Sequence, residues 1–98
     1  MTAGTPGWRP TGPLTLETAG AALAEARRAV ADGASRVDLS GVPQADSAGL
    51  AVLLDIVREA ARREQSLDIV GMPAGLRSLA DLYGVTDLLP LAEAAPGA

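Results

Sequence analysis

The chain contains no cysteine, no histidine and no lysine. Without cysteine there can be no disulfide, no thiolate chemistry and no cysteine-ligated metal. Without histidine the chain lacks the commonest general base and metal ligand, and it cannot contain a Ser-His-Asp triad of its own. The lysine of the phosphate-binding G-x-x-x-x-G-K-[ST] loop is missing as well. These absences argue against an enzyme, and we expect no catalytic residue, no cofactor and no metal.

Aromatic and basic residues are also scarce, with one tryptophan, one tyrosine, no phenylalanine and a net charge of −4. The arginine pairs at 27–28 and 62–63 lie in helical patterns beside acidic residues, which indicates solvated faces. Nucleic-acid binding needs exposed rings among basic residues, or a line of cationic side chains along the phosphates. It is therefore not expected.

Long apolar runs are absent, since none approaches the roughly 20 residues of a membrane span. Residues 1–13 also lack the basic region and apolar core of a signal peptide. We therefore expect a cytoplasmic protein that does not insert directly into a membrane.

The sequence does contain enough apolar residues for one core. Its 98 residues are 48% hydrophobic, mostly Ala, Leu and Val, which suits a single domain. The predicted elements alternate: a weak edge strand at 8–14, a helix at 15–31, a strand at 36–40, a helix at 47–63, a strand at 67–70 and a helix at 73–83. This order predicts an α/β fold of parallel strands joined by right-handed crossovers, with helices packed on the sheet.

Boundaries and buried faces follow from the same pattern. We expect residues 1–11 to form a flexible N-terminal tail with the weak edge strand, residues 12–90 the domain, and residues 91–98 a flexible C-terminal tail. The inner faces of the helices are predicted from apolar residues at three- and four-residue spacing. They are Leu16, Ala19, Leu23, Ala26 and Val30; Leu50, Leu53, Leu54 and Val57; and Leu76, Leu79, Ala80 and Tyr83.

The candidate site lies between the second predicted strand and the second predicted helix. The chain turns through Gly41 and Pro43, and the helix restarts near Asp46 and Ser47, either of which can cap it. A helix N-terminus offers unpaired N–H groups and a partial positive charge. Small residues follow, so a partner could approach the backbone, although a purely structural cap fits the same residues. Ser47 is no nucleophile elbow, because the first glycine of G-x-S-x-G is replaced by alanine.

Two stretches carry a family resemblance, VDLSGV at 37–42 and DSAGLAVLL at 46–54. They are similar to the signature of the STAS domain, and the resemblance runs from about Gly12 to Pro90. This family includes anti-sigma factor antagonists, sulfate-transporter tails and MlaB, the cytoplasmic subunit of the Mla ABC system that moves phospholipid between the membranes of Gram-negative bacteria. The resemblance implies a STAS-like (SpoIIAA-like) fold, a small mixed or parallel β-sheet flanked by helices, and a binding role.

The resemblance also implies roles for residues of the turn. Ser47 matches the position that is phosphorylated as a switch in anti-sigma factor antagonists, and Asp46 matches the acidic residue beside it. The residues expected to bind a partner are Pro43, Gln44, Asp46, Ser47, Ala48, Gly49 and Leu50.

Three functions are open at this point. The first is a non-enzymatic accessory subunit that binds the ATPase of a Mla-type phospholipid ABC transporter, at the inner face of the inner membrane, and so helps to maintain outer-membrane lipid asymmetry. The second is an anti-sigma factor antagonist that binds an anti-sigma factor kinase and is switched at Ser47. The short, proline-broken N-terminal strand favours the first over the second. The third is a nucleotide-binding domain, which no phosphate loop supports.

Overall fold

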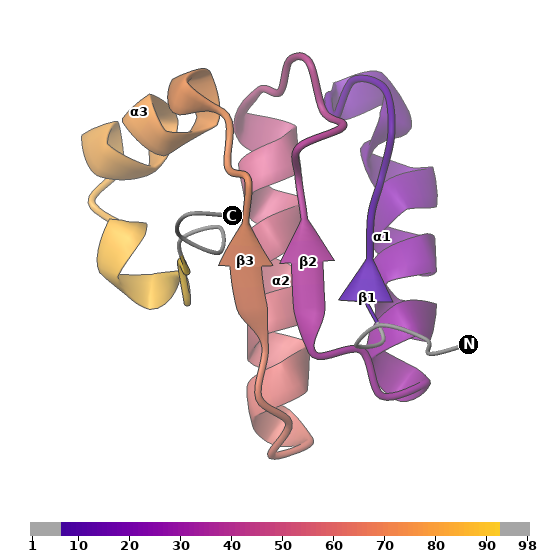
Figure 1. Cartoon of the computed structure of the whole chain (residues 1–98). Helices are drawn as coiled ribbons and strands as arrows, with labels where there is room; N and C mark the ends of the chain where they lie inside the picture. Colours follow the sequence, from indigo (N-terminus) through magenta and orange to yellow (C-terminus); the bar gives the residue numbers. More distant parts are fainter. Residues whose placement is uncertain (1–6, 93–98) are drawn as a thin grey trace, which may run out of the picture.

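The computed structural model describes residues 7–92 as a small parallel sheet with helices. The elements are β1 (Gly7–Trp8), α1 (Leu16–Ala31), β2 (Arg36–Asp38), α2 (Ser47–Arg62), β3 (Asp68–Val70), α3 (Ala74–Leu82) and the 3-10 helix η1 (Thr86–Leu88). The strand order is β1-β2-β3, and both pairs are parallel (Figure 1). The predicted α/β fold is confirmed. β1 is an edge strand of the described sheet, but it covers Gly7–Trp8 and not the predicted 8–14.

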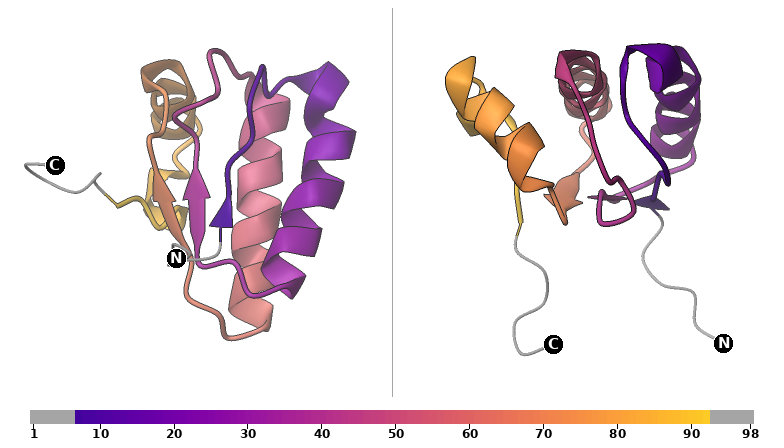
Figure 2. Two further views of the ribbon diagram at one scale, coloured as in Figure 1. Left: turned by 45° about the vertical axis from the view of Figure 1, so that its right-hand side comes forward. Right: turned by 90° about the horizontal axis from the view of Figure 1, so that it is seen from above.

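All three α-helices cover the same face of the sheet (Figure 2, right). The strands follow one another across the sheet in chain order. When each crossover between such neighbours is right-handed, all connecting helices lie on the same side of the sheet. Side chains alternate along the strands accordingly. Val37, Leu39 and Ile69 are fully buried toward the helices, whereas Arg36 and Asp68 are exposed on the other side. The opposite side of the sheet therefore carries charged side chains.

Two isolated pairings extend the sheet, one beyond the ends of β1 and β2 and one at the β3 edge. Leu14 pairs with Ala45 and Leu91 pairs with Ile69, both in parallel. The Ile69 N–H donates to the Pro90 carbonyl at 2.9 Å, and the Ala92 N–H donates to the Ile69 carbonyl at 2.8 Å. Hydrogen bonding thus continues two residues past the expected end of the domain at 90. The rest of the predicted tails, residues 1–6 and 93–98, lies outside the described residues.

The core lies between the sheet and the three helices. Its fully buried side chains include Leu39, Leu53, Ile56, Ile69 and Leu76. Trp8 is 6% exposed, and its indole N–H donates to Glu25 Oε1 at 3.3 Å. β1 is therefore tied to α1 as well as to β2.

Two residues predicted on inner helix faces are exposed, so those predictions are wrong. Leu16 is 76% exposed, because the buried residues of α1, Ala26 and Val30, lie in its second half and the first turn has none. Tyr83 is 56% exposed and is the C-cap of α3, beyond the last residue to which the helical pattern applies.

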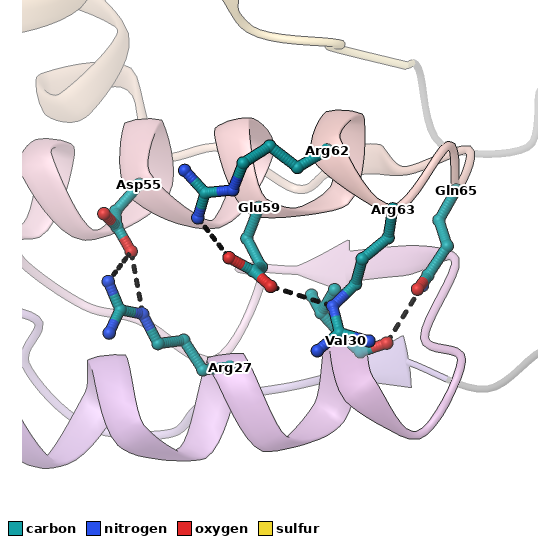
Figure 3. Close-up of polar contacts among 7 residues, drawn as sticks. All are labelled: Arg27, Val30, Asp55, Glu59, Arg62, Arg63 and Gln65. Atoms are coloured by element: carbon teal, nitrogen blue, oxygen red, sulfur yellow. Dashed lines mark hydrogen bonds and ion pairs between the residues drawn. The ribbon is translucent and has the colours of Figure 1, made fainter.

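Polar contacts join the C-terminal halves of α1 and α2 (Figure 3). Arg27 Nε and Nη2 donate to the same oxygen of Asp55, at 3.0 and 2.8 Å. Glu59 forms ion pairs with Arg62 and Arg63 within α2. Gln65 Nε2 donates to the Val30 carbonyl at 2.9 Å and so satisfies a carbonyl at the end of α1. The ion pairs among them are exposed, so each adds little free energy.

No helix among residues 7–92 is both long enough and apolar enough to cross a bilayer.

Candidate functional site

The carboxylate of Asp46 is shared by the N-termini of two helices. Its Oδ1 accepts the N–H groups of Ala48 and Gly49, in the first turn of α2, at 2.9 and 3.3 Å. Its Oδ2 accepts the N–H of Leu16, the first residue of α1, at 3.1 Å. Donation from Leu16, and then from Gly49 and Ala48, lowers the pKa of Asp46, against an opposing effect of desolvation. Asp46 is thus a charged cap for both helices.

Backbone hydrogen bonds hold the turn beside the N-terminal segment. Leu14 N–H donates to the Gln44 carbonyl at 2.9 Å, and Asp46 N–H donates to the Leu14 carbonyl at 3.2 Å. The Gly12 N–H donates to the Gly41 carbonyl at 3.1 Å. The turn at 41–46 is therefore a braced part of the fold, with its shape set before any partner arrives.

Gly49 is required by the close approach of α2 to this N-terminal segment. A Cβ at position 49 would lie 2.4 Å from the Leu14 carbonyl oxygen and 3.0 Å from Leu14 Cγ. Gly49 is buried, so the predicted open surface at this residue is wrong. Leu50 is 2% exposed and belongs to the core, so its predicted contact with a partner is wrong as well. Both residues are needed for packing.

Ser47 is the first residue of α2 and its side chain is exposed. Asp46 is the cap, so of the two capping candidates Ser47 is the one that keeps its hydroxyl for solvent. Within residues 7–92 the Ser47 side chain has no hydrogen-bond partner. Pro43 and Gln44 are exposed, and Ala48 is half-buried. These four residues and the half-buried Asp46 form the accessible part of the predicted site, which we call the 43–48 surface.

An apolar groove beside the 43–48 surface was missed by the sequence analysis. It lies between α1 and α2 and has a volume of about 420 Å³. Its lining residues are Ala19, Gly20, Leu23, Ala48, Ala51, Val52 and Asp55. The only signal in the sequence is Gly20, because a glycine inside a helix costs roughly 0.5–1 kcal/mol relative to alanine and needs a reason.

A second apolar surface lies on the α3 side of α2. Leu82 and Leu88 are 75% and 62% exposed. Leu88 also lines a groove of about 300 Å³ with Leu54, Val57, Arg58 and Ala61. Val42, the apolar residue of the turn, is buried at 4%. The apolar turn residue therefore belongs to the core, and exposed apolar side chains occur on the helices.

The small parallel sheet, its one-sided helix layer and the capped start of α2 define a domain of the STAS type. The chain belongs to the family described as "Mlab, STAS domain", whose model matches residues 9–90. The resemblance predicted from residues 37–54 is thereby confirmed.

A curated relative is the intermembrane phospholipid transport system binding protein MlaB of Haemophilus influenzae. It is 40% identical over 50 residues, which are 51% of this chain and 48% of the relative. The aligned part therefore spans about half the length of that protein.

Solved structures share the fold at low sequence identity. The unphosphorylated anti-sigma factor antagonist SpoIIAA aligns with a TM-score of 0.70 at 16% identity, covering 98% of this chain and 87% of that one. A putative anti-sigma factor antagonist of Thermotoga maritima gives 0.68 at 17% identity, covering 90% and 77%. A sulfate transporter family protein of Wolinella succinogenes gives 0.67 at 17% identity, covering 93% and 78%. At these identities the likeness concerns the fold.

Proposed function

We propose that this chain is a non-enzymatic accessory subunit that binds the cytoplasmic ATPase of a Mla-type phospholipid ABC transporter through the 43–48 surface. The observation that carries the proposal is the exposed Ser47 hydroxyl on a braced helix start, in a chain of the MlaB, STAS domain family. The partner would hold the subunit at the inner face of the inner membrane, where it serves outer-membrane lipid asymmetry.

The braced turn supports a docking role. Binding costs less when the contacting backbone is already ordered. Here the Asp46 carboxylate holds three N–H groups, and the turn pairs with Gly12 and Leu14. A partner that contacts Pro43, Gln44 and Ser47 meets a surface with little left to order.

The alternative is an anti-sigma factor antagonist switched by phosphorylation of Ser47. It is favoured by the exposed hydroxyl and by the fold shared with SpoIIAA. A phosphoserine adds about −1.5 to −2 charges. A helix N-terminus tolerates an anion. The Asp46 carboxylate beside Ser47 is already negative, so a phosphate would add a second negative charge at the same place. A phosphate on Ser47 would therefore disturb a close interface more than the fold itself.

The test is affinity capture from the native host followed by mass spectrometry, with wild type, Ser47→Ala and Ser47→Glu. Ser66→Glu is the matched control, because Ser66 is exposed in the loop before β3, away from the turn. We expect wild type and Ser66→Glu to retain an ABC ATPase that Ser47→Glu loses.

Two other results would change the assignment. Recovery of a kinase, with phosphate on Ser47 of the wild-type chain, establishes the antagonist instead. Equal recovery of one partner by all four chains places the interface elsewhere, and Ser47 is then only the first residue of a helix.

A further inference from the structure

The groove between α1 and α2 is a continuation of the 43–48 surface onto a second helix. Ala48 belongs to both, since it follows Ser47 and lines the groove. Ala51 and Val52 continue the α2 wall by one turn, and Gly20 stands in the α1 wall. A partner seated on the 43–48 surface therefore meets α1 as its next neighbour.

The walls of the groove allow a backbone to come close. Its lining is mostly alanine and glycine, and apart from the adjacent backbone of α1 no heavy atom lies within 4 Å of the place where a Gly20 Cβ would stand. Leu16 is 76% exposed and lies on the same side of α1 as Gly20 and Leu23, at spacings of four and seven residues. An open apolar groove, with an exposed leucine on the same side of α1, suits the apolar face of a helix.

Charge is distributed unevenly along the two helices. From the start of α1 to residue 26, and from the cap of α2 to residue 57, every charged residue is acidic: Glu17, Glu25, Asp46 and Asp55. The arginines of both helices follow later, at 27, 28, 58, 62 and 63. The apolar groove therefore opens at the acidic end of the helix pair, which complements a basic partner.

One lining residue of the groove, Asp55, has a carboxylate oxygen that accepts no hydrogen bond from the described residues. Asp55 lines the groove, and both hydrogen bonds from Arg27 go to its Oδ2 (Figure 3). Oδ1 has no hydrogen-bond partner among residues 7–92, and the Asp55 side chain is 28% exposed. A cationic side chain from a partner could therefore bind Oδ1 while the Arg27 ion pair stays intact.

We propose that the α1–α2 groove receives an amphipathic α-helix of the partner, whose apolar face is flanked by lysine or arginine. The proposal rests on the proposed function, because the partner is the ATPase subunit that docks on the 43–48 surface. It adds α1 to the interface and gives the chemistry of the segment that binds there.

Gly20→Leu tests the shape of the groove. The added side chain would occupy the groove. Because the space around Gly20 is open, the substitution should leave the fold intact. Ala21→Leu is the matched control, on the exposed neighbour outside the groove. The probe is the purified protein that wild type captures in the experiment above. We expect Gly20→Leu to weaken its affinity roughly tenfold and Ala21→Leu to leave it unchanged. Calorimetric titration measures both, and thermal melts confirm folding.

Ala51→Arg and Ala51→Glu test the charge of the partner, since they add similar bulk at one exposed groove position. A basic partner is repelled by arginine and tolerates glutamate, so we expect the arginine variant to bind more weakly. The opposite order overturns the proposal.

Several further results would overturn the inference. Equal affinity of Gly20→Leu and Ala21→Leu for the partner would show that the groove does not take part in binding. If Ser47→Glu still loses the ATPase in that case, the proposed function stands and only the inference about the groove fails. Self-association of wild type that Gly20→Leu abolishes would assign the groove to a second copy of this chain. A wild-type chain that captures no protein overturns both proposals.

Discussion

At the scale of single residues, two glycines inside helices have opposite reasons to be there. A Cβ on Gly49 would meet the Leu14 carbonyl at 2.4 Å, whereas a Cβ on Gly20 would meet nothing within 4 Å. We expect Gly49→Ala to lower the free energy of unfolding by roughly 1–3 kcal/mol, because backbone must move. Gly20→Ala should raise it by roughly 0.5–1 kcal/mol, because alanine is the better helix former. Urea denaturation of both variants measures the difference.

Equal effects of the two alanine substitutions would contradict this account. If both stabilise, the Leu14 segment yields without cost and Gly49 is incidental. If both destabilise, Gly20 has a packing role that the structure does not show.

How far single residues could be predicted depends on whether their role is local. Capping is local, so the sequence placed a cap at Asp46 or Ser47 and the structure selects Asp46. The bond from the Leu16 N–H to Asp46 spans 30 positions, and no local pattern encodes it. The same holds for Gly49, whose neighbour is Leu14.

At the scale of elements, Asp46 is the link between the first turns of α1 and α2. Asp46→Ala removes the acceptor of the Leu16 N–H as well as the cap of α2. We therefore expect faster amide hydrogen exchange at Leu16, far away in sequence, together with Ala48 and Gly49. Exchange measured by NMR checks this, and Glu17→Ala, an exposed acid in the same turn of α1, is the control.

Unchanged protection at Leu16 in Asp46→Ala would show that the two helix starts are held independently. Faster exchange in the Glu17→Ala control would show a general response of the first turn to lost negative charge.

Helices were predicted more closely than strands, for a physical reason. The bounds of α2 follow its own apolar repeat and differ from the prediction by one residue, at Arg62. The end of β2 at Asp38, two residues before the expected Ser40, depends on which neighbours pair with it. The predicted burial of Leu16 was wrong because an apolar repeat gives the spacing of a helix face but not the part of the helix that lies over the sheet.

At the scale of the whole molecule, folding is coupled to the ionisation of Asp38 and Asp46. The N–H of Ser40 lowers the pKa of Asp38 most, with help from its hydroxyl and from Arg9 and Arg36. Donation from Leu16 lowers the pKa of Asp46 most. The folded state thus holds these protons more weakly than the unfolded chain, whose carboxyls titrate near 3.8. Their contribution to stability is present above that pH and is lost as pH falls through the lowered values.

We therefore expect the melting temperature to decrease as the pH drops below about 4. The decrease should be less steep in Asp46→Asn, which carries no titratable group at the shared cap. Thermal melts followed by circular dichroism over this range give the comparison. A variant as acid-sensitive as wild type would show that other carboxyls dominate.

Trp8 gives the molecule a built-in optical reporter. It is the single tryptophan of the chain, it is 6% exposed, and its indole N–H is held by Glu25. Its emission therefore reports whether the edge strand remains docked, and detachment of β1 or global unfolding shifts that emission to longer wavelength. The groove lining does not include Trp8, so a ligand in the groove that lacks tryptophan leaves this spectrum unchanged. One fluorimeter trace can then separate loss of the fold from loss of the partner.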